Sequence, residues 1–125
     1  MNATLRAQNA YRSQAETTRS PRSIEYDAFA RITRKLKVAG VAGRQRMSAL
    51  ASAIHDNRRL WITLAVDVSD ADNPLPADLR ARILYLAEFT HLHSSKVLSG
   101  EAEIDALIDI NTAVMSGLSD RKMMK

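Results

Sequence analysis

The feature of this sequence that most restricts its fold is a series of apolar residues seven positions apart within residues 44–68. Seven residues make about two turns of an α-helix, so residues at this spacing share one face of the helix. Asn57 places one polar side chain within the series. We therefore expect a long helix over about 44–68, with its widest apolar face near Trp61. Its apolar positions are Met47, Leu50, Ile54, Trp61, Leu64 and Val68.

Three other segments have helical periodicity and are bounded by residues that favour helix ends. Pro21 suits the first position of a helix, where its missing N–H would have no partner anyway. Pro74 and Pro76 interrupt the helical pattern and predict a sharp turn before the next helix. Gly100 favours the end of that helix. The three expected helices span about 21–39, 77–98 and 101–118.

These helices and the size of the chain predict an all-α fold. The sequence has 125 residues but only 3 Pro and 4 Gly, so long loops and turn-rich β folds are not expected. Short connections between helices favour antiparallel neighbours. We predict one domain over residues 1–125, a compact antiparallel bundle of four to five helices. Residues 1–19 are expected to form a partly ordered arm or a short helix, and residues 119–125 a frayed polar tail.

Composition excludes several classes of protein. The sequence has no Cys, so it has neither disulfide bonds nor thiolate chemistry. Residues 1–10 lack the apolar core of a signal peptide. No uninterrupted apolar run approaches the roughly 18 residues that a membrane span needs, because Asp67 interrupts the longest candidate. We therefore expect a soluble protein of the cytoplasm that does not bind membranes.

The charges are distributed unevenly along the chain. The net charge is +8 over residues 1–60 and −4 over residues 61–125. A basic half can bind nucleic acid or an acidic partner, dock on the acidic half of the same chain, or form a solvated surface. No aromatic residue lies within the basic run to stack on bases, which weakens the nucleic-acid interpretation. The candidate patch for RNA or an acidic partner is Arg31, Arg34, Lys35 and Lys37.

The sequence contains no complete catalytic or metal-binding motif. Glu88 and His91 form one Glu-x-x-His pair, but carboxylate-bridged metal bundles need a second pair on another helix. Asp70 and Asp72 resemble the start of a calcium loop, but Leu75 occupies the position that requires Gly. There is no Gly-rich phosphate loop and no nucleophile elbow. We therefore expect no catalytic residue, metal, cofactor or small-molecule substrate.

The order of motifs adds a family resemblance over about residues 11–118. The first part of the pattern is Pro21-Arg22-x-x-Glu25-Tyr26-x-x-Phe29, followed by Ile32-Thr33-x-x-Leu36. The more specific part is Asn57-Arg58-Arg59-Leu60-Trp61-x-x-Leu64-Ala65-x-Asp67, followed by Asn73-Pro74-Leu75-Pro76-x-x-Leu79-Arg80-Ala81-x-Ile83. This pattern resembles the FlaF family of flagellar biosynthesis regulators of alphaproteobacteria.

The resemblance implies a cytoplasmic regulator, without catalytic residues, that is needed for flagellin production and filament assembly. It implies association with flagellin in a role like that of a secretion chaperone, alongside a partner regulator, FlbT, that acts on flagellin messenger RNA. The partner that the resemblance implies, flagellin, has amphipathic terminal segments that are not packed in the free monomer. A small bundle with spare apolar surface would cover them and prevent premature polymerisation.

We place the predicted flagellin contact on the motif residues that combine Trp, Arg and apolar side chains, the kind of anchors that interfaces use. The same residues also permit a structural interpretation, in which Trp61 belongs to the core and 73–76 only shape a turn. A second function is regulation of flagellin messenger RNA, directly through the basic patch or through FlbT; a third is a scaffold that acts only through FlbT. The predicted flagellin site is Arg58, Arg59, Trp61, Asn73, Leu75, Pro76 and Arg80.

Overall fold

A computed structural model describes residues 21–41 and 46–123, and side chains within 26–41 and 46–117. These residues form four helices and no strand, which confirms the predicted all-α bundle. The predicted arm at residues 1–19 lies outside the described residues. The helices are α2 (Pro21–Gly40), α3 (Arg46–Ser69), α4 (Ala77–Leu98) and α5 (Asp105–Met123).

Both ends of α5 differ from the prediction. The helix starts at Asp105 and not near residue 101, because the preceding residues terminate α4. Gly100 has a positive φ of 81°, and its N–H and that of Glu101 donate to the carbonyl oxygens of Val97 and Lys96. The helix then continues to Met123, five residues beyond its expected end at about residue 118. No Pro or Gly after residue 117 ends the helix earlier.

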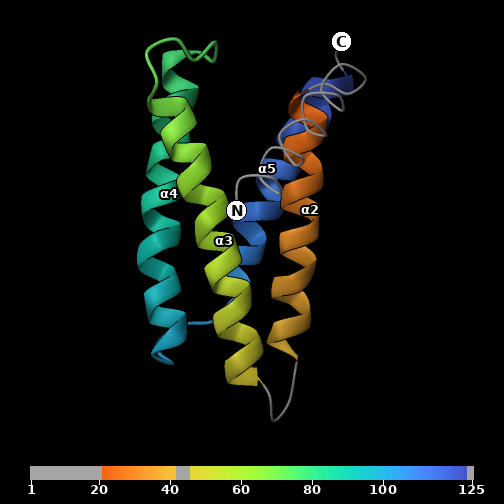
Figure 1. The fold of residues 1–125 in the computed structure, drawn as a ribbon, viewed down its shortest axis with the longest axis vertical. Helices are drawn as coiled ribbons and strands as arrows, with labels where there is room; N and C mark the ends of the chain where they lie inside the picture. Colours follow the sequence, from red (N-terminus) through yellow and green to blue (C-terminus); the bar gives the residue numbers. More distant parts are fainter. Residues whose placement is uncertain (1–20, 42–45, 124–125) are drawn as a thin grey trace, which may run out of the picture.

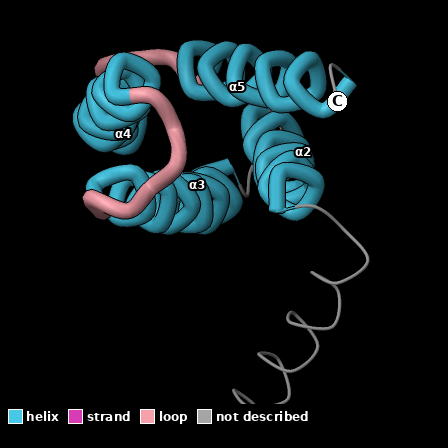
Figure 2. The backbone as a smooth tube through the Cα atoms, turned by 90° about the horizontal axis from the view of Figure 1, so that it is seen from above, coloured by secondary structure: helices cyan, strands magenta, loops and turns pink. Residues whose placement is uncertain are grey.

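The four helices run alternately up and down, so that successive helices are antiparallel (Figure 1). Around the bundle, α4 packs on α3, α3 on α2, and α2 on α5. Contacts between α4 and α5 are few, although one short connection joins them (Figure 2). Figure 1 shows that the α3–α4 pair and the α2–α5 pair diverge toward the α3–α4 connection. The fold is therefore two helix pairs joined mainly through α2 and α3.

The main apolar core lies toward the end of the bundle at which these pairs converge. All four helices or their connections contribute to it, and Leu36, Ala53 and Leu107 are fully buried. Met47 is 62% exposed, which contradicts its predicted place on the buried face of the 44–68 helix. It lies in the first turn of α3, near the end of the bundle. The core residues are Leu36, Ala39, Leu50, Ala53, Ile54, Val97, Ile104 and Leu107.

A buried polar network connects α3 to α5. Trp61 Nε1–H donates to Asn111 Oδ1 at 2.9 Å, and Asn111 Nδ2 donates to Asn57 Oδ1 at 2.8 Å. Phe29 of α2 packs against Trp61 edge to face, with ring centroids 5.6 Å apart. Asn57, the polar residue that interrupts the apolar series of α3, therefore has a buried hydrogen-bonding partner on another helix.

None of the described helices combines the length and the apolar character that a membrane span requires.

Candidate partner-binding groove

A groove of about 300 Å³ runs between α3 and α4 on the side where these helices face solvent. Its walls are mainly apolar, with Ile62 on α3 and Leu84 and Leu92 on α4. Their exposed fractions are 58%, 39% and 56%, and Val66, one helical turn beyond Ile62, is 68% exposed. We call this surface the α3–α4 groove. Its lining residues are Arg58, Trp61, Ile62, Ala65, Leu84, Ala87, Glu88, Thr90, His91 and Leu92.

The apolar residues of the groove are exposed because they do not lie on the core-facing rows of their helices. Val68 lies on the same face of α3 as Trp61, and both are buried. Ile62 and Val66 are about 100° and 140° away from Trp61 around the helix axis, given about 100° per residue. The bundle therefore buries one face of α3 and leaves a second, smaller apolar face in contact with solvent.

Arg58 joins the two walls of the groove. Its Nη2 donates to the backbone oxygen of His91 at 2.9 Å and to Ser95 Oγ at 2.6 Å. These bonds commit the half-buried guanidinium to holding α3 against α4. Glu88 and His91 are exposed beside it, but no cluster of three or more potential metal ligands exists among the described residues.

Trp61 belongs to the interior, as the structural interpretation of the sequence expected. Only 1% of its surface is exposed, and its indole N–H is already bonded to Asn111. Its ring forms part of the groove floor. A ligand in the groove would therefore meet mainly the exposed neighbours of Trp61, above all Ile62.

The other predicted contact residues mostly shape the connection between α3 and α4. Asn73 Nδ2 donates to the backbone oxygen of Asp67 at 3.1 Å, and Asn73 Oδ1 accepts from the Leu75 N–H at 3.0 Å. Pro76 directly precedes α4, and its oxygen accepts from the Arg80 N–H at 3.0 Å. These contacts form the turn at one end of the groove. Arg59 is exposed and forms no ion pair with any described residue.

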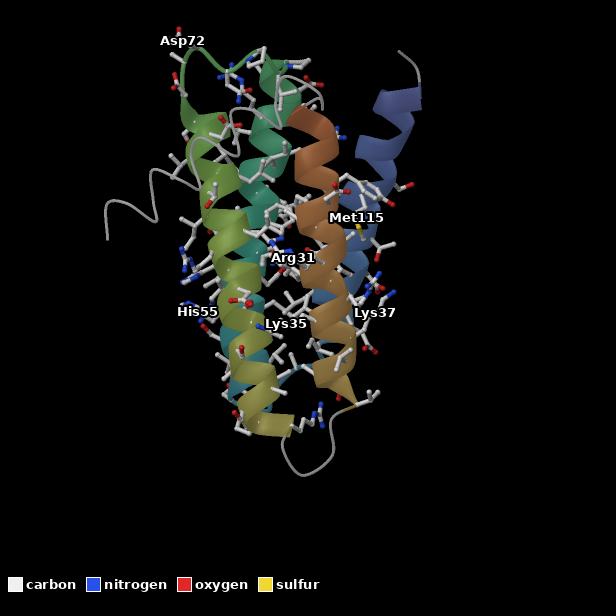
Figure 3. The ribbon with its side chains drawn as sticks, turned by 45° about the vertical axis from the view of Figure 1, so that its right-hand side comes forward. Arg31, Lys35, Lys37, His55, Asp72 and Met115 are labelled. Atoms are coloured by element: carbon white, nitrogen blue, oxygen red, sulfur yellow. The ribbon has the colours of Figure 1, made fainter. Side chains whose placement is uncertain are left out.

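The predicted basic patch does not form one surface. All four of its residues are exposed, but Figure 3 shows Arg31 and Lys35 on the side of α2 toward α3 and Lys37 on the side toward α5. Lys35 also forms an ion pair with Asp56 of α3. The hydrogen bond that Lys35 Nζ donates to Asp56 Oδ2 is the main cause that lowers the pKa of Asp56 below its ordinary value of 3.8. The charge of Arg31 acts in the same direction. The strip between α2 and α3 is thus partly neutralised.

Replacing Asp56 by Asn should lower the free energy of unfolding at neutral pH by at most about 1 kcal/mol, because both side chains are more than a third exposed. A carboxyl group with a lowered pKa in the folded state stabilises the fold above its unfolded pKa. That contribution disappears as the pH falls below about 4. Urea denaturation at about pH 7 and pH 3 should therefore show a smaller difference between variant and wild type at the lower pH. An equal difference at both pH values would contradict the ion-pair explanation.

The sequence prediction missed most of the groove. Ile62, Leu84 and Leu92 were not among the predicted contact residues, although the sequence contains a signal for them. Both helices carry more large apolar residues than one core-facing row can hold, and α4 in particular has Leu84, Tyr85, Phe89 and Leu92 in addition to its inward positions. Surplus apolar residues on an otherwise amphipathic helix indicate a second contact surface.

A comparison with protein families matches nearly the whole chain. The model of the family described as "Flagellar protein FlaF" matches residues 7–118, which include α3, α4 and the connection between them. No curated protein and no solved structure matches the chain.

Proposed function

The chain belongs to the FlaF family of flagellar proteins, and from this membership we propose that it promotes flagellin production and filament assembly by binding flagellin as a chaperone. The observation that carries the proposal is the exposed apolar α3–α4 groove. Chains that fold alone rarely leave several large apolar side chains together in solvent without a partner to cover them.

The shape and chemistry of the groove suit an amphipathic helix. Two antiparallel helices form its walls, and a third helix can lie between them with apolar residues at i, i+3, i+4 and i+7 facing inward. Ile62 and Leu84 supply the apolar contact inside the groove. Val66, one helical turn beyond Ile62, extends the exposed apolar face of α3 beside it. The exposed Glu88 lines the groove and is available for polar contacts. A terminal segment of flagellin held in this way would be covered until export.

The test is titration calorimetry of the purified protein with monomeric flagellin at two salt concentrations. Binding through the groove should give a negative heat-capacity change and depend little on salt. Val66→Glu should weaken binding at least about tenfold, because it places a charge on the exposed apolar face of α3 that adjoins the groove. Val38→Glu is the matched control: Val38 is 61% exposed, like Val66 at 68%, but it lies on α2. This control should bind like the wild type.

Three other results have distinct meanings. Equal binding by both Val variants would place the flagellin contact elsewhere on the chain. Strong salt dependence with no effect of Val66→Glu would direct attention to the basic residues of α2 and to RNA. Absence of flagellin binding, combined with capture of FlbT, would replace direct flagellin handling by a role that operates through that regulator.

A further inference from the structure

A second exposed surface runs along α4 and shares only Leu92 with the wall of the groove. Its six residues follow the spacing 4-3-4-3-4, which is the spacing of the contact row in a left-handed coiled coil. All six are exposed. The row has charged residues at both ends and three large apolar residues near its centre. We call it the α4 outer row: Asp78, Arg82, Tyr85, Phe89, Leu92 and Lys96.

No described helix covers this row. The residues of α4 that are buried in the bundle are Thr90, Ser94 and Val97, which lie on another face of the helix. Tyr85 is 69% exposed, and Phe89 is 38% exposed even though its ring stacks on His93. A helix that is apolar on more than its core-facing side normally has a second packing partner.

We propose that the α4 outer row is the contact between two copies of this chain, with the two α4 helices antiparallel. The 4-3-4-3-4 spacing is symmetric about the level of residue 87 along α4. A twofold axis at that level therefore pairs every residue of the row with a residue of the row on the second copy. Tyr85 then faces Phe89 of the second copy, and Arg82 faces Leu92. At both ends, Asp78 faces Lys96. Two-chain contacts of this isologous kind are the commonest form of oligomer.

Charge complementarity selects a second copy in this orientation. Neither Asp78 nor Lys96 forms an ion pair with any described residue, so both are available. Antiparallel pairing creates two Asp78–Lys96 contacts, one at each end of an apolar centre. Parallel pairing would instead place Asp78 against Asp78 and Lys96 against Lys96, which is unfavourable. The row extends about 27 Å at a rise of about 1.5 Å per residue, nearly the full length of α4.

This inference does not depend on the proposed function. Ile62 and Val66 lie on α3, Ile62 in the wall of the groove and Val66 beside it, and this side of the groove remains open in such a dimer. Leu92 borders both surfaces, so it is not suitable for telling them apart. Tyr85 and Phe89 are suitable, because neither lines the groove.

Sedimentation equilibrium of the full chain tests the proposal. The mass should rise with concentration from 13.9 kDa to twice that value. Tyr85→Glu and Phe89→Glu should each weaken the dimer at least about tenfold, while the matched control Val38→Glu leaves it unchanged. Circular dichroism verifies that each variant is folded. If Phe89→Glu fails to fold, Tyr85→Glu alone still tests the dimer contact, because Tyr85 has the more exposed side chain.

A charge exchange tests the orientation. Asp78→Lys alone should weaken the dimer, because it sets two positive charges against each other at both ends of the row. Adding Lys96→Glu to the same chain should restore it, because the pairs become opposite in charge again. A parallel dimer would show no such rescue. A wild-type chain that stays monomeric at every concentration overturns the proposal, as does a dimer that neither Glu variant weakens. If the wild type is monomeric and Tyr85→Glu abolishes its flagellin binding, the row binds flagellin and not a second copy.

Discussion

Replacing Trp61 by Ala is expected to lower the free energy of unfolding by about 3–5 kcal/mol, the range found when a buried Trp or Phe is truncated to Ala. The side chain is 1% exposed and packs edge to face on Phe29. Its removal leaves a cavity at the junction of three helices and removes the N–H that Asn111 accepts. An effect of this size is a large part of the stability of a domain of ordinary size.

Urea denaturation followed by far-ultraviolet circular dichroism measures this effect, since Trp61 is the only Trp and its fluorescence is lost in the variant. The matched control is Ile62→Ala, the next residue of the same helix, which is 58% exposed. We expect a change within about 0.5–1 kcal/mol for that control. Equal losses from the two variants would show that Trp61 is not part of the interior, and that its place in the family motif reflects a partner contact instead.

The helix boundaries that the sequence predicted well are those at which the chain forces a break. Pro21 begins α2, and Pro76 directly precedes α4. These residues act locally, because Pro lacks an N–H and restricts its own φ. The start of α5 depended instead on how residues 99–104 complete the end of α4. Helical periodicity alone cannot separate an acidic first turn from an acidic connection that precedes it.

The candidate site was only partly predictable for a similar reason. Arg58 and Arg59 are adjacent in the motif, and the sequence gives them equal weight. In the bundle, Arg58 is bonded across to α4 and Arg59 is exposed, because neighbouring residues of a helix point in directions about 100° apart. Which of the two faces α4 depends on the packing of that helix. The same applies to Ile62, whose exposure follows from the position of α4 and not from its own apolar character.

The two residues Asn57 and Arg58 connect the interior of the bundle to the groove. Asn57 is bonded through Asn111 to α5, and the next residue, Arg58, is bonded to α4. Polar contacts on successive residues therefore fix α3 against two helices that contact each other little. A polar bond requires a defined register where apolar packing permits sliding. The Arg58 bonds therefore fix α3 against α4, the other wall of the groove, and the Asn57–Asn111 bond fixes α3 against α5.

Asn111→Leu tests this connection and should lower the free energy of unfolding by about 2–6 kcal/mol, because two buried polar groups lose their partner. The substitution keeps the branched shape of the side chain but leaves Asn57 Oδ1 and the Trp61 N–H buried without their partner, each at a cost of about 1–3 kcal/mol. Thr112→Ala, at the exposed next residue of α5, is the control and should change stability by no more than about 0.5 kcal/mol.

The double variant Asn57→Leu/Asn111→Leu shows whether the network acts as a unit. Once Asn111 has been replaced, replacing Asn57 removes a group that is already without this partner. The double variant should therefore lose less unfolding free energy than the sum of the losses of Asn57→Leu and Asn111→Leu. Additive losses would mean that the two amides contribute independently. If Asn111→Leu weakened flagellin binding in a protein that remains folded, while Thr112→Ala did not, the buried network would be what holds α3 in the position that forms the groove.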